Sequence, residues 1–138
     1  MPLLNVQQVP LEYVNQVWPQ VEGFIEQALG YSCGDYSTEE AKVMVVTGMW
    51  SLLVAVTPEN TVQGAAIVSY FNRPSHRIGF IIAVGGKLIT NQDTWEQLQN
   101  ILRANGATYL EGAGRDSVVR LWARFGIEKK YTIIGKEL

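Results

Sequence analysis

Residues 77–112, RIGFIIAVGGKLITNQDTWEQLQNILRANGATYLEG, change hydrophobic periodicity twice. The first part, 77–84, is almost continuously apolar, which is typical of a strand buried on both faces. Apolar side chains then recur at helical spacing, in Trp95, Leu98, Ile101 and Leu102. We expect Asp93 to cap this helix and Gly106 to end it. A second short strand, 107–112, follows, so the unit predicts a right-handed crossover between two parallel strands.

Upstream of this unit, the sequence predicts two helices and two strands. The apolar stripe from Val14 to Leu29 is interrupted by Pro19, so we expect a short helical turn followed by a new start. Ser37 and Glu40 have the capping-box spacing, and Gly48 is expected to end the helix that they begin. Two β-rich segments separated by a turn, 50–56 and 62–71, predict a hairpin.

Downstream, a helical stripe at 118–125 ends at Gly126, and residues 128–138 have the pattern of a final strand. The whole order is helices, an antiparallel meander and then the strand–helix–strand unit. It predicts an α+β or three-layer αβα fold, with helices on both faces of a central, twisted, mixed and mostly antiparallel sheet. We expect one domain, 1–138.

Composition narrows the function classes. The chain has 11 basic and 13 acidic residues, a formal charge of -2 and no block of like charge, so nothing indicates nucleic-acid binding. One cysteine and one histidine argue against a disulfide and against a metal site. No apolar run is long enough for a membrane helix, and the N-terminus lacks a signal-peptide pattern. We expect a soluble protein that is intracellular or is carried within something made inside a cell.

The segment LWARFGI, 121–127, resembles the closing helix of the GNAT family, the GCN-five-related N-acetyltransferases. The predicted order of elements is also similar to that of GNAT proteins along nearly the whole chain. Short GNAT-like proteins of tailed phages are more similar still, since they share the features seen here at Gly48 with MWSLLV, Gly85-Gly86, Trp95 and Gly114-Arg115.

The resemblance implies a fold that binds acetyl-CoA where two parallel strands splay apart, near residues 84–87 and 111–115, and an amine acceptor. It implies cofactor contacts from Val84, Gly85, Gly86, Lys87 and Trp122. Family members use a carboxylate base on the central strand, which has none here. Glu111, on the neighbouring strand, is therefore the expected base, and Arg115 is expected to orient a ligand anion.

Each of these residues also has a structural interpretation. Gly85-Gly86 form either a small anion nest or a glycine turn. Trp122 stands where the family keeps a proton-donating tyrosine. An indole donates a hydrogen bond but no proton, so Trp122 either contacts the sulfur or fills the core. Arg115 clamps an anion or pairs with Asp116 or Asp35.

Other chemistry-bearing residues favour structural roles. His76 has a suitable pKa for a base but lies in a predicted turn, where solvation is the commoner state. Cys33 has no basic neighbour or histidine partner in sequence, which indicates a passive thiol. Tyr109 and Tyr131 are alternative sources of a hydroxyl. The four tryptophans, Trp18, Trp50, Trp95 and Trp122, fall on apolar stripes and are expected in the core.

Two functions therefore remain open. One is an acyl-CoA-dependent N-acetyltransferase or close derivative. The other is a catalytically inactive GNAT-like phage protein with a structural role, bound to other virion proteins. Three features that the family uses are altered together: the glycine spacing of the pyrophosphate-binding loop, the carboxylate on the central strand and the tyrosine of the last helix. These changes favour the second function as strongly as the fold favours the first.

Overall fold

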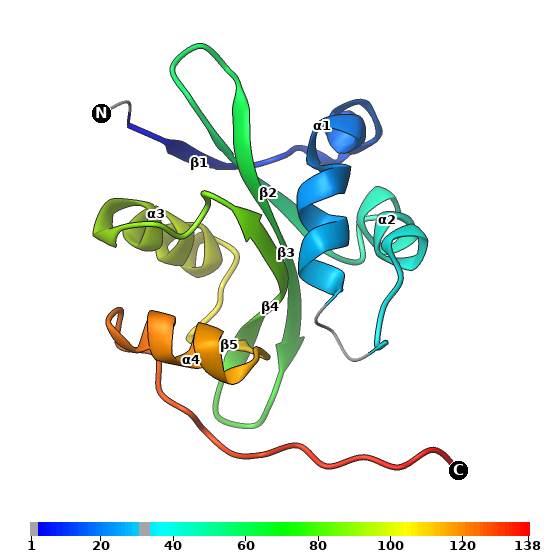
Figure 1. Cartoon of the computed structure of the whole chain (residues 1–138), viewed down its shortest axis with the longest axis vertical. Helices are drawn as coiled ribbons and strands as arrows, with labels where there is room; N and C mark the ends of the chain where they lie inside the picture. The colour runs from blue at the N-terminus through cyan, green and yellow to red at the C-terminus, as the bar shows by residue number, and fades with distance from the viewer. Residues whose placement is uncertain (1–2, 31–33) are drawn as a thin grey trace.

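The computed structural model describes residues 3–30 and 34–138, and in it a five-stranded mixed sheet separates two pairs of helices (Figure 1). The strands lie in chain order, and all neighbours are antiparallel except β4 and β5, which are parallel. The elements are β1 (Asn5–Gln8), α1 (Leu11–Leu29), α2 (Thr38–Val46), β2 (Ser51–Val56), β3 (Val62–Asn72), β4 (Arg77–Gly86), α3 (Gln92–Ala104), β5 (Tyr109–Gly112) and α4 (Asp116–Ala123).

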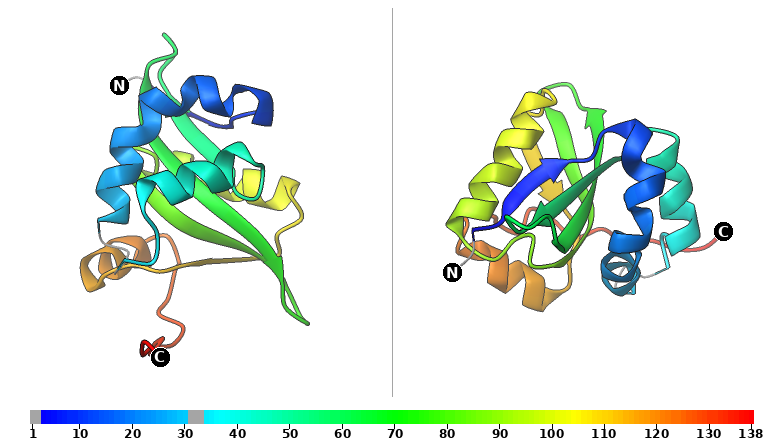
Figure 2. Two further views of the ribbon diagram at one scale, coloured as in Figure 1. Left: turned by 90° about the vertical axis from the view of Figure 1, so that its right-hand side faces the viewer. Right: turned by 90° about the horizontal axis from the view of Figure 1, so that it is seen from above.

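Each face of the sheet is covered by one helix pair, as Figure 2 shows. On one face, α1 and α2 bury Trp18, Val21, Ile25 and Val45 against Leu52, Val54 and Ile67. On the other face, α3 and α4 bury Trp95, Leu98, Leu102 and Trp122 against Leu53, Val68 and Ile81. This mixed sheet with helices on both faces confirms the predicted fold class.

The crossover unit has the predicted form. β4 and β5 are parallel and joined through α3, and β4 is covered by helices from both sides. The predicted cap of α3 is wrong by two residues. Asn91 is the cap, because its side chain accepts from the Thr94 N–H while the Thr94 hydroxyl accepts from the Asn91 N–H. Asp93 lies one residue inside the helix instead, where its carboxylate accepts from Gln97.

The predicted break at Pro19 is also wrong, since α1 runs without interruption from Leu11 to Leu29. A proline inside a helix removes one backbone hydrogen bond and bends the axis. Figure 2 shows this helix changing direction along its length. The buried side chains lie on both sides of the proline, and their burial outweighs the lost bond; they are Val14, Trp18, Val21, Ile25 and Leu29.

The capping box that begins α2 is confirmed. Glu40 N–H donates to Ser37 Oγ at 3.1 Å, and Ser37 N–H donates to Glu40 Oε1 at 2.9 Å. Gly48 follows the helix with φ of +81°, a conformation that favours glycine, so its role as the stop is confirmed as well.

The two ends of the chain differ from the sequence prediction. The segment Asn5–Gln8 forms β1, which the sequence pattern did not indicate, antiparallel to β2. Residues 127–138 form no strand, so the predicted final strand is wrong. The tail carries apolar side chains that lie in the open, with Ile133 76% and Ile134 89% exposed. A strand pattern gains stability only when a neighbour covers one face, and no described residue does so here.

Candidate functional site

The parallel strands β4 and β5 separate like a fork. Their pairing extends only from Ile78 with Tyr109 to Ile81 with Gly112. Beyond this point β5 ends, while β4 continues to Gly86. The edge of β4 from Ile82 onward therefore has no strand partner among residues 3–30 and 34–138.

A cleft of about 330 Å³ occupies the fork. One side is the continuous edge of β4, and the other is the loop after β5 together with α4. Helix α1 closes one end. The lining residues are Ile81, Ile82, Ala83, Val84, Gly85 and Gly86 from β4, Ala113, Gly114, Arg115, Val118 and Trp122 from the loop and α4, and Gln27 and Ala28 from α1.

The structure brings together most of the residues predicted for the site. Val84, Gly85, Gly86, Arg115 and Trp122 all line the cleft. Lys87 and Glu111, which were predicted with them, do not line it. Sequence reasoning missed Gln27 and Ala28, whose position depends on how α1 packs across β4 and which no local motif marks.

A β-bulge lies at the point where the strands part. Along β4, Ala83 pairs with Ile67 and Ile81 pairs with Val68, so Ile82 has no partner on β3. A bulge leaves one residue out of the ladder and is common beside active sites. The bulge therefore leaves Ile82 without a partner on β3. Ile82 also lines the cleft.

The two glycines at the end of β4 are required by packing. A Cβ on Gly85 would lie 2.5 Å from the carbonyl oxygen of Phe24 in α1. Gly86 has φ of +67°, and a Cβ there would lie 2.5 Å from the carbonyl oxygen of Gln63. Of the two interpretations left open by the sequence, these contacts favour the glycine turn.

Glu111 is held in ion pairs outside the cleft. Arg73 binds the carboxylate through both terminal nitrogens, with Nη2 2.9 Å from Oε1, and Lys130 Nζ lies 2.6 Å from Oε2. The hydrogen bonds from Arg73, and after them those from Lys130, lower the pKa of Glu111 from 4.5 to about 2. A carboxylate this acidic is a weak base at neutral pH, so the base role remains a prediction that the ion pairs oppose.

We expect Glu111→Gln to lower the free energy of unfolding by about 1 kcal/mol, because Arg73 and Lys130 are surface side chains screened by water. The lowered pKa gives Glu111 a stabilising contribution that is complete above pH 4.5 and is lost as the pH falls towards about 2. Denaturant unfolding between pH 2 and pH 7 measures both effects. A variant with wild-type stability but an acyl-transfer rate at least ~100-fold lower would instead identify Glu111 as the base.

Trp122 fills the core and also borders the cleft. The side chain is only 9% exposed and belongs to the core beneath α3 and α4, yet it also lines the cleft. Its ring lies against Gly112, where a Cβ would come within 3.6 Å of the Trp122 ring. Tyr109 and Tyr131, the alternative hydroxyl sources, are 38% and 60% exposed and do not line the cleft.

Of the remaining candidate residues, Arg115 lies at the cleft and His76 does not. Arg115 is the N-cap residue of α4, and its carbonyl accepts from the Val118 and Val119 N–H groups, which fixes it at the cleft. His76 lies in the turn between β3 and β4, exposed and 3.0 Å from the Thr108 hydroxyl, away from the cleft. Cys33 lies outside the described residues.

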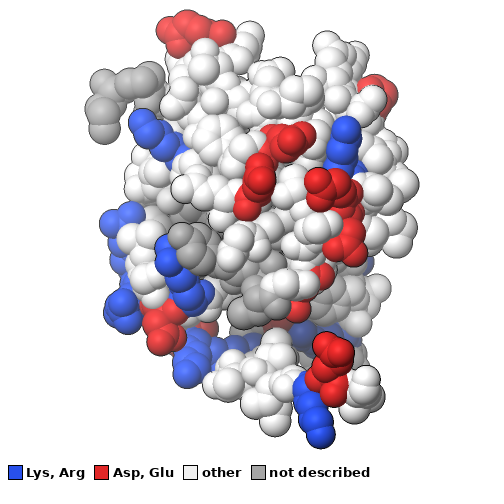
Figure 3. All heavy atoms as spheres, turned by 45° about the vertical axis from the view of Figure 1, so that its right-hand side comes forward, with Lys and Arg blue, Asp and Glu red and all other residues white. Residues whose placement is uncertain are grey.

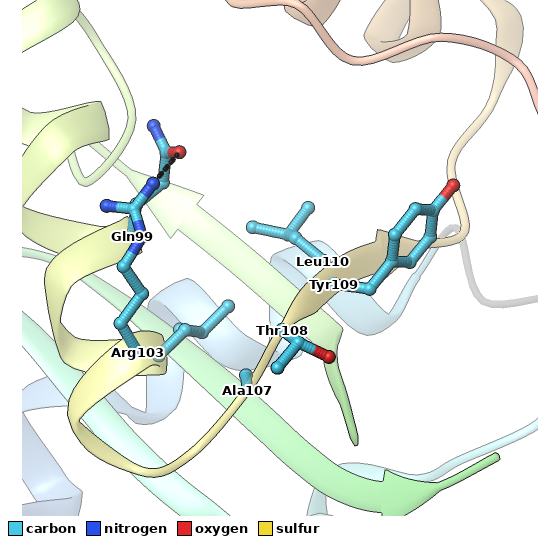
Figure 4. Close-up of a pocket in the computed structure, with 7 residues that line it drawn as sticks. Gln99, Arg103, Ala107, Thr108, Tyr109 and Leu110 are labelled. Carbon is cyan, nitrogen blue, oxygen red and sulfur yellow. Dashed lines mark hydrogen bonds between the residues drawn. The ribbon is translucent and has the colours of Figure 1, made fainter. Parts of the chain in front are cut away.

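A second hollow, of about 270 Å³, lies between α3 and β5 (Figure 4). Leu102, Ala107 and Leu110 form its apolar part. Its one charged side chain, Arg103, already donates to Gln99 and Asn100 on its own helix. With its guanidinium engaged on α3, this hollow offers less to a ligand than the fork, which has an unpaired strand edge.

The surface charge is mixed. In Figure 3 basic and acidic side chains both occur across the face shown, with uncharged surface between them. In the described part of the chain, no helix has the length and apolar character to cross a membrane. Nor do three or more His, Cys, Asp or Glu side chains within residues 3–30 and 34–138 gather as a metal site requires.

Comparison with solved structures identifies the fold. An aminoglycoside N-acetyltransferase, AAC(6')-Iy, in complex with CoA superposes with a TM-score of 0.69 at 10% identity, over 100% of this chain and 96% of that one. The fold is that of the GNAT acetyltransferases. A ribosomal-protein-alanine N-acetyltransferase from Brucella melitensis biovar Abortus 2308 has a TM-score of 0.69 at 13% identity, over 99% of both chains. A possible acetyltransferase from Clostridium difficile 630 has a TM-score of 0.65 at 9% identity, over 99% and 98%.

At these identities the likeness establishes the GNAT fold alone. No protein-family model matches the sequence, and no curated protein matches it. The activity of this GNAT-fold chain therefore has to be argued from its own cleft.

Proposed function

We propose that the chain binds an acyl thioester in the fork between β4 and β5 and transfers the acyl group to an amine. One observation carries the proposal: the fork is open, with a cleft of about 330 Å³ along an unpaired strand edge. A GNAT-fold protein that had become purely structural would gain stability by filling this space with side chains.

The residues present fit the arm of an acyl-pantetheine. This arm is a narrow, extended chain that contains amide groups, so it can pair with a strand edge as a peptide does. The unpaired edge of β4 from Ile82 to Gly86 would provide the backbone groups, and Val118 and Trp122 would provide an apolar wall. When bound, the thioester supplies an activated acyl carbon to the reaction.

Transfer exchanges one bond for another at that carbon. The amine nitrogen forms the new C–N bond, the C–S bond breaks, and the sulfur leaves as a thiolate. The amine loses one proton to water and the thiolate takes one proton from water, so no net proton is gained or lost. Ile82 lines the cleft and has no partner on β3, so its N–H would be the group that donates to the acyl oxygen, and the apolar walls would exclude bulk water and strengthen that bond.

Within residues 3–30 and 34–138, no side chain that lines the cleft can act as a base. Arg115 is the one charged side chain among these lining residues, and a guanidinium donates hydrogen bonds without accepting any. The amine must therefore lose its proton to water before it attacks.

We expect the logarithm of the transfer rate to rise by about 1 per pH unit from pH 6 to pH 9 for an alkyl amine, whose pKa is ~10. Initial rates of thiol release at saturating thioester measure this slope. A plateau with a midpoint near pH 7 would instead reveal a side-chain base.

The proposal is tested by incubating the protein with acetyl-CoA or acetyl-pantetheine and a panel of primary amines. The panel consists of an aminoglycoside, a polyamine and a peptide with a free N-terminal alanine. We expect amine-dependent release of thiol above the rate without protein. The absence of transfer to any amine would favour the second function, a catalytically inactive GNAT-like phage protein with a structural role.

That second function is favoured by one observation: the described residues that line the cleft include neither a base nor a proton-donating hydroxyl. We infer the narrower identity, a phage-encoded protein of the host cytoplasm or of the virion with other virion proteins as partners, from the sequence resemblance alone. Detection of the protein as a stoichiometric component of purified particles would support it.

A further inference from the structure

We propose that the cleft recognises the pantetheine arm of its acyl donor and gains no affinity from a nucleotide diphosphate. The donor is then any acyl-pantetheine, whatever group is joined to the far end of the pantetheine arm. That group can be a nucleotide, as in acyl-CoA, or a carrier protein. This inference rests on the proposed function and concerns the same cleft.

The loop that follows β4 lies flat on the sheet. The Lys87 N–H donates to the Gln63 carbonyl of β3 at 2.9 Å, and the Leu88 side chain is completely buried. The backbone nitrogens of Lys87 and Leu88 lie so close to Gly64 that a Cβ there would come within 2.8 and 2.6 Å of them. The Lys87 N–H is therefore already paired with β3 and is not available to a ligand phosphate.

Side chains of the capping box occupy part of the N-terminus of α3. A helix N-terminus binds an anion through N–H groups that have no other acceptor. Here the Thr90 and Asn91 N–H groups donate to Thr94 Oγ1 at 3.2 and 3.3 Å, and the Thr94 N–H donates to Asn91 Oδ1 at 2.9 Å. Thr94 is only 1% exposed, so this capping box is part of the core and does not open readily.

The charges near this helix end also disfavour a diphosphate. Asp93 places a carboxylate in the first turn of α3 and would repel a ligand phosphate. The guanidinium of Arg124 acts in the opposite sense, but it is exposed to solvent and donates to the Thr90 carbonyl at 3.4 Å. Lys87 is exposed and does not line the cleft, so it offers a screened point charge of little affinity.

The size of the cleft agrees with this assignment. A volume of about 330 Å³ lies at the low end of the range for small-molecule sites, which runs from ~300 to ~1,000 Å³. Such a space accommodates an arm between two strands. The same space does not also accommodate an adenine nucleotide. The nucleotide would remain on the surface, beside the loop that follows β4.

Calorimetry with D-pantetheine and with CoA tests the proposal directly, because both carry the same arm and thiol. We expect dissociation constants that agree within about threefold. We also expect CoA binding to change less than about twofold between low and high salt, since no phosphate contact is made. A CoA affinity more than about tenfold above that of pantetheine would overturn the inference while leaving the proposed function intact. No binding of either compound at millimolar concentration would overturn both.

Two variants verify that the measured binding occurs in the fork. Ala113 is an exposed loop residue that lines the cleft, so Ala113→Trp should fill the cleft and weaken both compounds by about tenfold or more. The matched control is Ala104→Trp, at the exposed end of α3 and outside the cleft, and it should change neither affinity. Lys87→Ala should leave the ratio of the two affinities unchanged, and a selective loss of CoA binding would contradict the proposal.

Discussion

Replacing Trp122 with alanine is expected to lower the free energy of unfolding by about 3 to 5 kcal/mol, the largest effect we predict for a residue of the cleft. The side chain is 9% exposed and packs in the core between the sheet, α3 and α4. Its removal leaves a cavity among the core residues of this face, which the surrounding structure closes only in part. Denaturant titration at neutral pH measures the loss.

The same substitution should impair the cleft. The Trp122 ring forms the wall between the end of β5 and α4, so without it the cleft would merge with the new cavity. We expect pantetheine affinity to fall by at least about tenfold. Trp122→Phe, which keeps an apolar ring, should retain most of the stability and of the affinity. A loss of less than ~1 kcal/mol for Trp122→Ala would show that the ring is not part of the packed core.

The crossover unit was predictable because each of its parts has a local signal. The apolar run that forms β4 and the helical stripe of Trp95, Leu98 and Leu102 each indicate one element, and connection rules allow one handedness. The position of the fork came instead from the resemblance to the GNAT family. The cleft at that fork is lined by Val84, Gly85, Gly86, Arg115 and Trp122, whose roles in binding stay predictions.

Features that depend on distant partners were not predictable. Asn5–Gln8 becomes a strand because β2 offers an edge, although the segment has no strand pattern of its own. Residues 128–138 have such a pattern and form no strand, since no neighbour covers them. Glu111 illustrates the same limit at the site, because Arg73 reaches it from 38 residues away and changes its chemistry. A pKa of about 2 cannot be read from the local sequence.

Gly85→Ala is expected to lower the free energy of unfolding by about 2 to 3 kcal/mol, through overpacking rather than loss of contacts. The new Cβ would lie 2.5 Å from the carbonyl oxygen and 3.1 Å from the carbonyl carbon of Phe24. Both atoms belong to the backbone of α1, so no side-chain rotation relieves the clash and the helix itself must move. Gln27 and Ala28 would move with it, and they line the cleft, so pantetheine and CoA should lose affinity in parallel.

Gly23→Ala is the matched control, because Gly23 precedes Phe24 in α1 and a Cβ there would meet nothing within 4 Å. Alanine is the better helix former, so this variant should gain about 0.5 to 1 kcal/mol, opposite in sign to Gly85→Ala. If Gly85 instead formed an anion nest, Gly85→Ala would leave stability nearly unchanged and weaken CoA alone. The sign of the stability change and the ratio of the pantetheine and CoA affinities therefore distinguish two roles for Gly85. In one role it allows α1 to pack closely against the sheet, and in the other it binds a phosphate.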